Sequence, residues 1–175
     1  MIINNRIILR KKSMDDAWDD YSWETDHELA RLDAAPVIAI PYSEYLEDYT
    51  EELRRPHRHS CQFAVDTLDG KHIGNCSYYN IDKFTGETEM GIMIGDRDYW
   101  DKGYGTDVVN TLLDHIFSET KLERIHLKTL EWNTRAKKCF SKCGFSPCGK
   151  LERSGFRFIT MEIFRHQWEE RQIRT

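Results

Sequence analysis

Two glycines separated by one residue lie in the segment Trp100-Asp101-Lys102-Gly103-Tyr104-Gly105-Thr106, directly before an amphipathic stretch. Glycines at the start of a helix let backbone N–H groups converge on an anion, and the helix dipole favours negative charge there. The segment differs from a dinucleotide-binding fingerprint, because Val108 occupies the third glycine position, and no Gly-Lys-Ser/Thr of a P-loop follows. It therefore predicts an anion-binding turn, although a tight turn that only begins a helix fits the same two glycines.

A second segment runs from Asn133 to Phe145 and contains the residues that begin and end a helix. Asn133 is typical of an N-cap, and Gly144 is typical of a C-cap whose backbone is left-handed. Ala136 and Phe140 lie between them, at positions that share one helix face. The spacing predicts a short helix that follows the strand after the first motif.

Together the two segments resemble the GNAT-type N-acetyltransferase superfamily. Its pattern is a Gln/Arg-x-x-Gly-x-Gly/Ala loop that opens a helix, then a strand, then Asn-x-x-Ala, an aromatic residue four positions on, and Gly-Phe. Both halves match in order and spacing. The layout from Ile8-Leu9-Arg10 through Trp23-Glu24-Thr25-Asp26 to Met161-Glu162-Ile163 is most similar to the branch of ribosomal-protein and polyamine N-acetyltransferases. The resemblance covers essentially the whole chain and implies acetyl-CoA as the acetyl donor.

The resemblance also implies where acetyl-CoA binds. Backbone amides of the glycine segment would hold the pyrophosphate, and the pantetheine arm would pair with the edge of the preceding strand. The implied cofactor-binding residues are Ile92, Met93, Ile94, Lys102, Gly103, Tyr104, Gly105, Thr106, Asn133, Lys138 and Phe140. Ordinary structural roles also fit three of them, because Asn133 suits an N-cap, Lys138 a polar helix face and Phe140 a core position.

Acetyl transfer requires a group that takes a proton from the amine. Glu89 stands where many relatives carry this general base, and Glu87 is the substitute on the same strand face, although both also fit paired or solvated strand carboxylates. Phe140 replaces the tyrosine that protonates the leaving thiolate in many relatives, so the thiolate leaves unassisted or is assisted by Ser141 or by a tyrosine elsewhere. Trp100 replaces the usual Gln or Arg of the loop, which removes no backbone donor.

The acceptor side is expected in residues 13–55, where thirteen acidic residues stand against three basic ones within a chain of net charge −5. Carboxylates and aromatic faces suit a cationic amine. The aromatic residues of this segment are Trp18, Tyr21, Trp23, Tyr42, Tyr45 and Tyr49. A polyamine, an aminoglycoside-like amine and a protein N-terminus all fit, and a solvated helix face accounts for any single charge.

The hydrophobic pattern places these residues on a definite series of elements. Period-two alternation predicts strands, and the spacing of Val108, Val109, Leu112, Leu113, Ile116 and Phe117 predicts a helix. The expected strands cover 6–11, 61–67, 72–81, 87–94, 124–130, 146–153 and 157–164, and the expected helices cover 14–33 with a break near Thr25–Asp26, 43–54, 106–120 and 133–144. This order predicts an α/β (α+β) fold with a GNAT-type mixed, mostly antiparallel central sheet and helices on both faces.

Composition limits the remaining function classes. The 175 residues predict a single domain over 1–175, and the calculated pI of about 5.8 disfavours a general nucleic-acid binder. No membrane-spanning run or signal peptide is recognised, and the five cysteines form no paired framework, so a cytoplasmic protein with reduced thiols and no metal site is expected. His57 and His59 are expected to be exposed loop residues, and a metal-binding or proton-relay role is the alternative.

The motifs and the composition are compatible with two functions. The first is an acetyl-CoA-dependent N-acetyltransferase that works by direct transfer in a ternary complex, with a small-molecule or peptide amine as partner and, by resemblance, a homodimer as its assembly. The second is a non-catalytic acyl-CoA-binding sensor or interaction module. Phe140 favours the second function, whereas Glu89 and the acidic aromatic segment favour the first.

Overall fold

The computed structural model describes residues 1–55 and 58–173, so His57 lies outside the described residues. Within them one mixed sheet has the strand order β1-β2-β3-β4-β5-β6-β8-β7, and its neighbouring strands are antiparallel except for the parallel pair β5 and β6. The strands are β1 (Ile2–Ile3), β2 (Ile7–Arg10), β3 (Ser60–Thr67), β4 (His72–Asp82), β5 (Glu87–Ile94), β6 (Arg124–Leu130), β7 (Ser146–Arg153) and β8 (Phe156–Phe164). The predicted mixed, mostly antiparallel sheet is confirmed.

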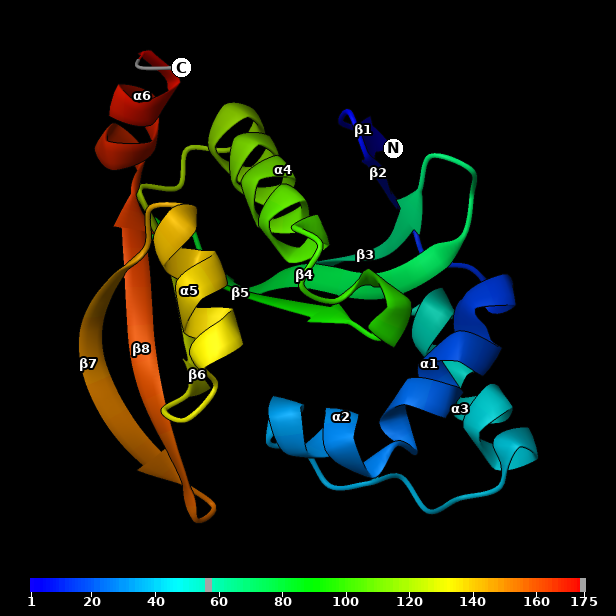
Figure 1. The fold of residues 1–175 in the computed structure, drawn as a ribbon. Coiled ribbons are helices and arrows are strands. Elements are labelled where there is room, and N and C mark those ends of the chain that lie inside the picture. Colours follow the sequence, from blue (N-terminus) through cyan, green and yellow to red (C-terminus); the bar gives the residue numbers. More distant parts are fainter. Residues whose placement is uncertain (56–57, 174–175) are drawn as a thin grey trace.

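Helices cover both faces of this sheet, as Figure 1 shows with β3–β5 running between α4 and the group α1–α3. The helices are α1 (Ala17–Glu24), α2 (His27–Asp33), α3 (Tyr42–Arg54), α4 (Tyr104–Glu119), α5 (Thr134–Lys142) and α6 (Arg165–Ile173), with short 3-10 turns at Met14–Asp16 and Arg97–Tyr99. The predicted break near Thr25–Asp26 is confirmed, because the Asp26 side chain caps α2 by accepting the N–H groups of Glu28 and Leu29. Among the described helices, none is long and apolar enough to cross a membrane.

Two elements differ from the sequence expectation. The expected strand over 6–11 is shorter, and a turn at Asn4 separates it from β1, because the Asn4 side-chain oxygen accepts the N–H groups of Arg6 and Ile7 at 2.8 and 2.9 Å. The C-terminal helix α6 was not expected at all. Its composition is strongly polar, and it is held through Trp168, which packs on Phe117 of α4 with ring centres 5.4 Å apart.

The main core lies between the sheet and α4. Val108, Leu112 and Ile116 of α4 are fully buried there, together with Ile125 and Leu127 of β6. Their spacing is the apolar stripe that predicts this helix. Gly144 then ends α5 with φ +99°, the left-handed conformation expected of a C-cap glycine.

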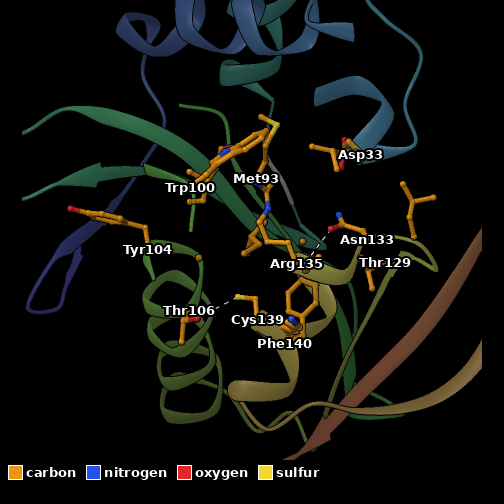
Figure 2. Close-up of a pocket in the computed structure, with 18 of the residues that line it drawn as sticks. Asp33, Met93, Trp100, Tyr104, Thr106, Thr129, Asn133, Arg135, Cys139 and Phe140 are labelled. Atoms are coloured by element: carbon orange, nitrogen blue, oxygen red, sulfur yellow. Dashed lines mark hydrogen bonds between the residues drawn. The ribbon is translucent and has the colours of Figure 1, made fainter. Parts of the chain in front are cut away.

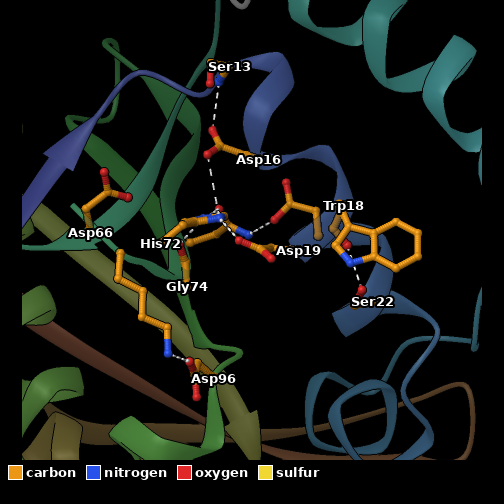
Figure 3. Close-up of polar contacts among 12 residues, drawn as sticks. Ser13, Asp16, Trp18, Asp19, Ser22, Asp66, His72, Gly74 and Asp96 are labelled. Atoms are coloured by element: carbon orange, nitrogen blue, oxygen red, sulfur yellow. Dashed lines mark hydrogen bonds and ion pairs between the residues drawn. The ribbon is translucent and has the colours of Figure 1, made fainter.

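Buried charges fasten α1 to the other face of the sheet (Figure 3). Asp16 accepts two hydrogen bonds from the Arg10 guanidinium at 2.8 and 2.6 Å, and Arg10 Nε donates to Asp66 at 2.6 Å. His72 of β4 lies 3.2 Å from Asp19 and 3.6 Å from Asp16. Because the Arg10 guanidinium is shared by the carboxylates of Asp16 and Asp66, the burial of these two carboxylates is compensated. The start of α1, and with it the segment that leads to Glu24, is held against β4.

Candidate active site

A cavity opens where β5 and β6 separate. The two strands are paired only from Glu87–Arg124 to Glu89–His126 in the described chain. Beyond this point β5 stays paired with β4 as far as Ile94–Gly74, while β6 follows β8 as far as Leu130–Phe158. The space between them is a cavity of about 700 Å³, and Figure 2 shows the side chains that point into it.

The side of β5 that faces this cavity carries free backbone positions. Gly95 N–H donates to Ile73 of β4, whereas the Ile94 carbonyl accepts the indole N–H of Trp100 at 2.6 Å. Backbone groups alternate sides along a strand, so the N–H and C=O of Ile92 face the same way as the Ile94 carbonyl. Ile92, Met93 and Ile94 all line the cavity. This edge can therefore pair with an extended ligand that carries amide groups.

The glycine segment forms the next wall of the cavity. Gly103 has φ +87° and is the N-cap of α4, so the N–H groups of Tyr104, Gly105 and Thr106 belong to the unsatisfied first turn. These four residues line the cavity. In the described structure Lys102 stands outside the lining, and its carbonyl accepts a hydrogen bond from Arg6. The first turn of α4 thus offers several N–H donors to an anion that enters the cavity.

Positive charge surrounds this anion position. Lys138 and Arg135 of α5 line the cavity, and the Arg135 guanidinium lies 3.7 Å from the centre of the Trp100 ring. Asn133 caps α5, because its side chain accepts the Ala136 N–H at 3.1 Å. The residue also lines the cavity, where a cofactor could contact it. The site matches a ligand with phosphate groups at this end.

Phe140 and Cys139 form the wall contributed by α5. Phe140 is buried against Phe145 with ring centres 5.9 Å apart and still lines the cavity. The Cys139 sulfur lies 3.6 Å from the Thr106 hydroxyl. A hydrogen bond from Cys143 lowers the pKa of Cys139 to about 7 against the effect of burial. Ser141, one of the expected helpers of the thiolate, is exposed on the helix and stands outside the described lining.

The two expected catalytic carboxylates lie at different depths. Glu87 is half-buried and forms an ion pair with Arg124 at 2.6 Å. Glu89 is buried and accepts hydrogen bonds from Tyr79 at 3.0 Å, Asn80 at 3.3 Å and Lys128 at 2.8 Å. Burial raises the pKa of Glu89, but the hydrogen bond and charge of Lys128, together with the hydrogen bond from Tyr79, lower it more, and the net pKa lies below its usual value. Neither glutamate belongs to the described cavity wall, whereas Tyr79 and Lys128 do.

A second cavity, of about 500 Å³, meets the first on the face of the sheet that carries α1 and α2. The residues common to both walls are Leu29, Asp33, Tyr79, Gly91, Ile92 and Met93. Two carboxylates line this second space. Asp33 projects into both cavities, where desolvation raises its pKa although solvent still reaches it, and Glu24 accepts a hydrogen bond from Tyr45 at 2.9 Å. Burial raises the pKa of Glu24 more than that bond lowers it.

The acidic segment contributes fewer aromatic faces than expected. Trp23 lines the second cavity, and Gly95 leaves room for its indole, since a Cβ at that position would lie 2.1 Å from the ring. Tyr45 and Tyr49 instead pack with Ala17 in a small separate core, and Trp18 is exposed beside Tyr42. Of the six aromatic residues expected to suit a cationic amine, only Trp23 lines either cavity of the described structure, because α1 and α3 use most of the others to pack on each other.

Sequence reasoning missed three residues that line the cavities: Asp33, Tyr79 and Lys128. Asp33 lay within the acidic segment but carried no distinguishing motif, and the other two occupy ordinary strand positions. Within the described residues, no group of three or more His, Cys, Asp or Glu side chains is arranged to hold a metal ion.

Comparison with known proteins supplies an independent view of the same chain. The family model described as "Acetyltransferase (GNAT) domain" matches residues 6–146. The chain is 25% identical over 167 residues to the uncharacterized N-acetyltransferase p20 of Bacillus licheniformis, which covers 93% of each chain. It is 27% identical over 100 residues to the spermine/spermidine N(1)-acetyltransferase of Bacillus subtilis (strain 168), covering 54% of this chain and 66% of that protein.

Two solved structures have the same fold. Spermidine N-acetyltransferase from Vibrio cholerae, in complex with CoA and spermine, aligns with a TM-score of 0.83 and 19% identity over 95% of this chain and 99% of that one. Aminoglycoside acetyltransferase AAC(6')-Ib, in complex with coenzyme A, aligns with a TM-score of 0.78 and 19% identity over 95% and 99% of the two chains.

Proposed function

The chain belongs to the acetyltransferase (GNAT) domain family, and on this premise we propose that it transfers the acetyl group of acetyl-CoA directly to a primary amine within a ternary complex. The observation that carries the proposal is the shared border of the two cavities, formed by Tyr79, Asp33 and the segment Gly91–Met93. A donor in the first cavity and an acceptor in the second would meet at this border. Direct transfer needs both substrates bound at once with the reacting atoms about 3–3.5 Å apart. Residues 1–175 would act as one domain, since a single sheet carries both cavities.

Acetyl-CoA suits the first cavity by its chemistry. Its pyrophosphate would bind the N–H groups of Gly103–Thr106 beside Lys138, and its pantetheine amides would pair with the edge at Ile92–Ile94. Asn133 and Phe140 would flank the pantetheine arm. Lys102 stands outside the described cavity wall. It would therefore contribute through its charge near the phosphates rather than by lining the cavity.

The second cavity suits a cationic amine. Its two carboxylates, Glu24 and Asp33, form no ion pair with a lysine or arginine among the described residues, and the one lysine of its lining, Lys12, is paired with Asp20. A compact amine with two positive charges would place one nitrogen near Asp33, at the border with acetyl-CoA, and the other near Glu24. Proteins of the same fold named for spermidine and aminoglycoside acetylation support an amine with several charges as the acceptor.

Glu89 would be the final proton acceptor in this reaction, and Glu87 is a weaker candidate because it is paired with Arg124 outside the cavity wall. Phe140 offers no proton to the leaving sulfur. The thiolate would therefore leave as an anion and take its proton from solvent, since Ser141 is turned away on the surface of α5.

The test is a measurement of acetyl transfer from acetyl-CoA to a panel of amines, read by the mass of the product. The panel contains spermidine, 1,4-diaminobutane, butylamine, kanamycin, and basic and neutral N-terminal peptides. The expected result is a mass increase of one acetyl group on the multiply charged small amines. Tight acetyl-CoA binding without product on any amine would overturn the proposal in favour of a non-catalytic acyl-CoA-binding module.

A further inference from the structure

We propose that Tyr79 is a catalytic residue that takes the proton of the acceptor amine and at the same time passes its own hydroxyl proton to Glu89. The inference rests on the proposed acetyl transfer. An amine must lose a proton as it attacks the thioester, and the inference concerns the path of that proton. The group that contacts the amine is the phenol of Tyr79 rather than the carboxylate of Glu89.

Glu89 is too deeply placed to contact an amine in either cavity. It is 7% exposed, and in the described structure it belongs to the wall of neither cavity. Its carboxylate is covered from the cavity side by Tyr79 and Lys128, which both donate hydrogen bonds to Oε1. A proton from the amine must therefore reach Glu89 through one of these two covering groups or through water.

Tyr79 occupies the border where the amine and the thioester would meet. It lies directly opposite Glu89 in the β4–β5 register, so both side chains project from the same face of the sheet. Its ring lies along β5 over Gly91, since a Cβ at position 91 would be 3.7 Å from Cε1 and 4.0 Å from the hydroxyl oxygen. Tyr79 lines both cavities.

The two groups have the protonation states that a relay needs. Burial and the charge of Glu89 raise the pKa of Tyr79, so the phenol keeps its proton. Lys128 holds Glu89 as a carboxylate, which accepts the phenol O–H at 3.0 Å. Lys128 itself is a cation that would repel an ammonium, so Tyr79 is the covering group with a lone pair to offer the amine N–H.

The step balances as follows. An N–H proton of the amine moves to the Tyr79 oxygen while the Tyr79 proton moves to Glu89, so Tyr79 is unchanged at the end. The nitrogen lone pair forms the C–N bond to the acetyl carbon, and the C–S bond breaks with its electron pair on sulfur. Glu89 then releases its proton to solvent, and the thiolate of CoA takes one from solvent.

The experiment compares Tyr79→Phe with Tyr78→Phe. Both variants lose one hydroxyl oxygen from adjacent residues of β4, but Tyr78 is buried on the other face in the main core. On the best amine of the panel, Tyr79→Phe is expected to lower kcat by about 100- to 1000-fold, as for loss of a general base. Tyr78→Phe is expected to stay within about threefold of the unchanged enzyme. Thermal unfolding and the Kd for acetyl-CoA check that both variants fold and bind the donor.

A double variant tests whether Tyr79 and Glu89 act on one step, and a proton inventory separates a relay from a structural hydrogen bond. Tyr79→Phe/Glu89→Gln is expected to be no slower than the slower of the two single variants, since residues of one relay act as a unit. In mixtures of H2O and D2O, the rate of the unchanged enzyme is expected to curve with deuterium content because two protons move together, and that of Tyr79→Phe to be linear.

Three outcomes would overturn the relay. They are a Tyr79→Phe rate within about threefold of the unchanged enzyme, multiplied losses in the double variant, or a linear isotope response in the unchanged enzyme. Failure of the proposed function itself looks different, because the unchanged protein then acetylates no amine of the panel.

Discussion

The Cys139 sulfur lies directly behind Gly105, so that a Cβ atom at position 105 would be 3.5 Å from it and 3.8 Å from the side chain of Ile92. These are ordinary van der Waals distances. One methyl group therefore fits at position 105 without strain, and the backbone there is not left-handed. A larger branched side chain would have to extend towards the cavity, where the proposed pyrophosphate approaches the first turn of α4.

Gly105→Val is expected to abolish acetyl-CoA binding while the protein stays folded. The branched side chain would occupy the space that the phosphate oxygens need to reach the backbone N–H groups. Calorimetric titration with acetyl-CoA measures the effect, and a loss of at least about 100-fold in affinity, or roughly 2.7 kcal/mol, is expected. Gly105→Ala is the matched control and should bind within about tenfold of the unchanged protein. Undiminished binding by the valine variant would contradict the placement of the cofactor.

Cys139 offers a chemical probe of the same contact. The hydrogen bond from Cys143 lowers the pKa of Cys139 below that of an ordinary cysteine, which raises its thiolate fraction at neutral pH. Iodoacetamide is therefore expected to modify Cys139 at pH 7, and saturating acetyl-CoA to slow that reaction at least about tenfold by covering the cavity wall. Exposed Cys148, on the edge strand β7, is the internal control whose labelling should not respond. Peptide mass analysis distinguishes the two sites, and equal labelling of Cys139 with and without acetyl-CoA would argue against binding in this cavity.

Local sequence patterns were sufficient for most of the elements, and most of the cofactor-binding residues that the resemblance implies lie on one cavity. The apolar stripe of α4, the glycines at its start and the caps of α5 all depend on residues close together in the chain. The glycine segment, the strand edge and Asn133 therefore lie on one cavity as expected. The sequence pattern did not predict the polar helix α6, because this helix packs through Trp168 on Phe117 of α4, which is distant in the chain.

The acceptor side could not be read from the sequence in the same way. Asp33, Tyr79 and Lys128 come from three segments far apart in the chain, and they meet only because β5 and β6 separate after three paired residues. Strand alternation places Glu89 on one face but does not reveal that Tyr79 and Lys128 cover it. The burial of a polar residue such as Glu89 depends on neighbours that are distant in the chain, so a local sequence pattern does not predict it.

Glu24→Gln is expected to discriminate between amines with one and two positive charges. If the second ammonium of 1,4-diaminobutane lies near Glu24, loss of this carboxylate removes a charge-assisted contact, and KM should rise by about tenfold or more, equal to roughly 1.4 kcal/mol. Butylamine has no second ammonium, and its kcat/KM should change by less than about threefold. Steady-state kinetics with both amines measure the difference. An equal effect on both amines would show that Glu24 acts through the fold, since it also holds Tyr45.

Lys128→Met is expected to move the acidic limb of the kcat/KM profile to higher pH. In the unchanged protein burial raises the pKa of Glu89, and Lys128 makes the largest contribution among the groups that lower it to below its usual value. Removing the ammonium leaves burial as the main effect, so Glu89 would take up its proton at a higher pH and stop accepting one from the amine. Lys128→Arg keeps the positive charge and should keep the limb near its original pH.

The free energy of unfolding is expected to depend on pH through the same carboxylate, Glu89. Because the folded pKa of Glu89 is lowered, its carboxylate contributes stability above the unfolded pKa of about 4.3, and this contribution is lost as pH falls through the folded pKa. Lys128→Met should lower the free energy of unfolding at pH 7 by about 2 kcal/mol, between the values for exposed and fully buried pairs, because the Lys128 side chain is 33% exposed. The deficit should shrink as pH falls through the lowered folded pKa of Glu89, because Glu89 then becomes neutral in both proteins. Urea unfolding at pH 7 and at a pH below the folded pKa of Glu89 measures it, and a deficit that is the same at both values would mean that the lysine stabilises the fold through packing rather than through the charge of Glu89.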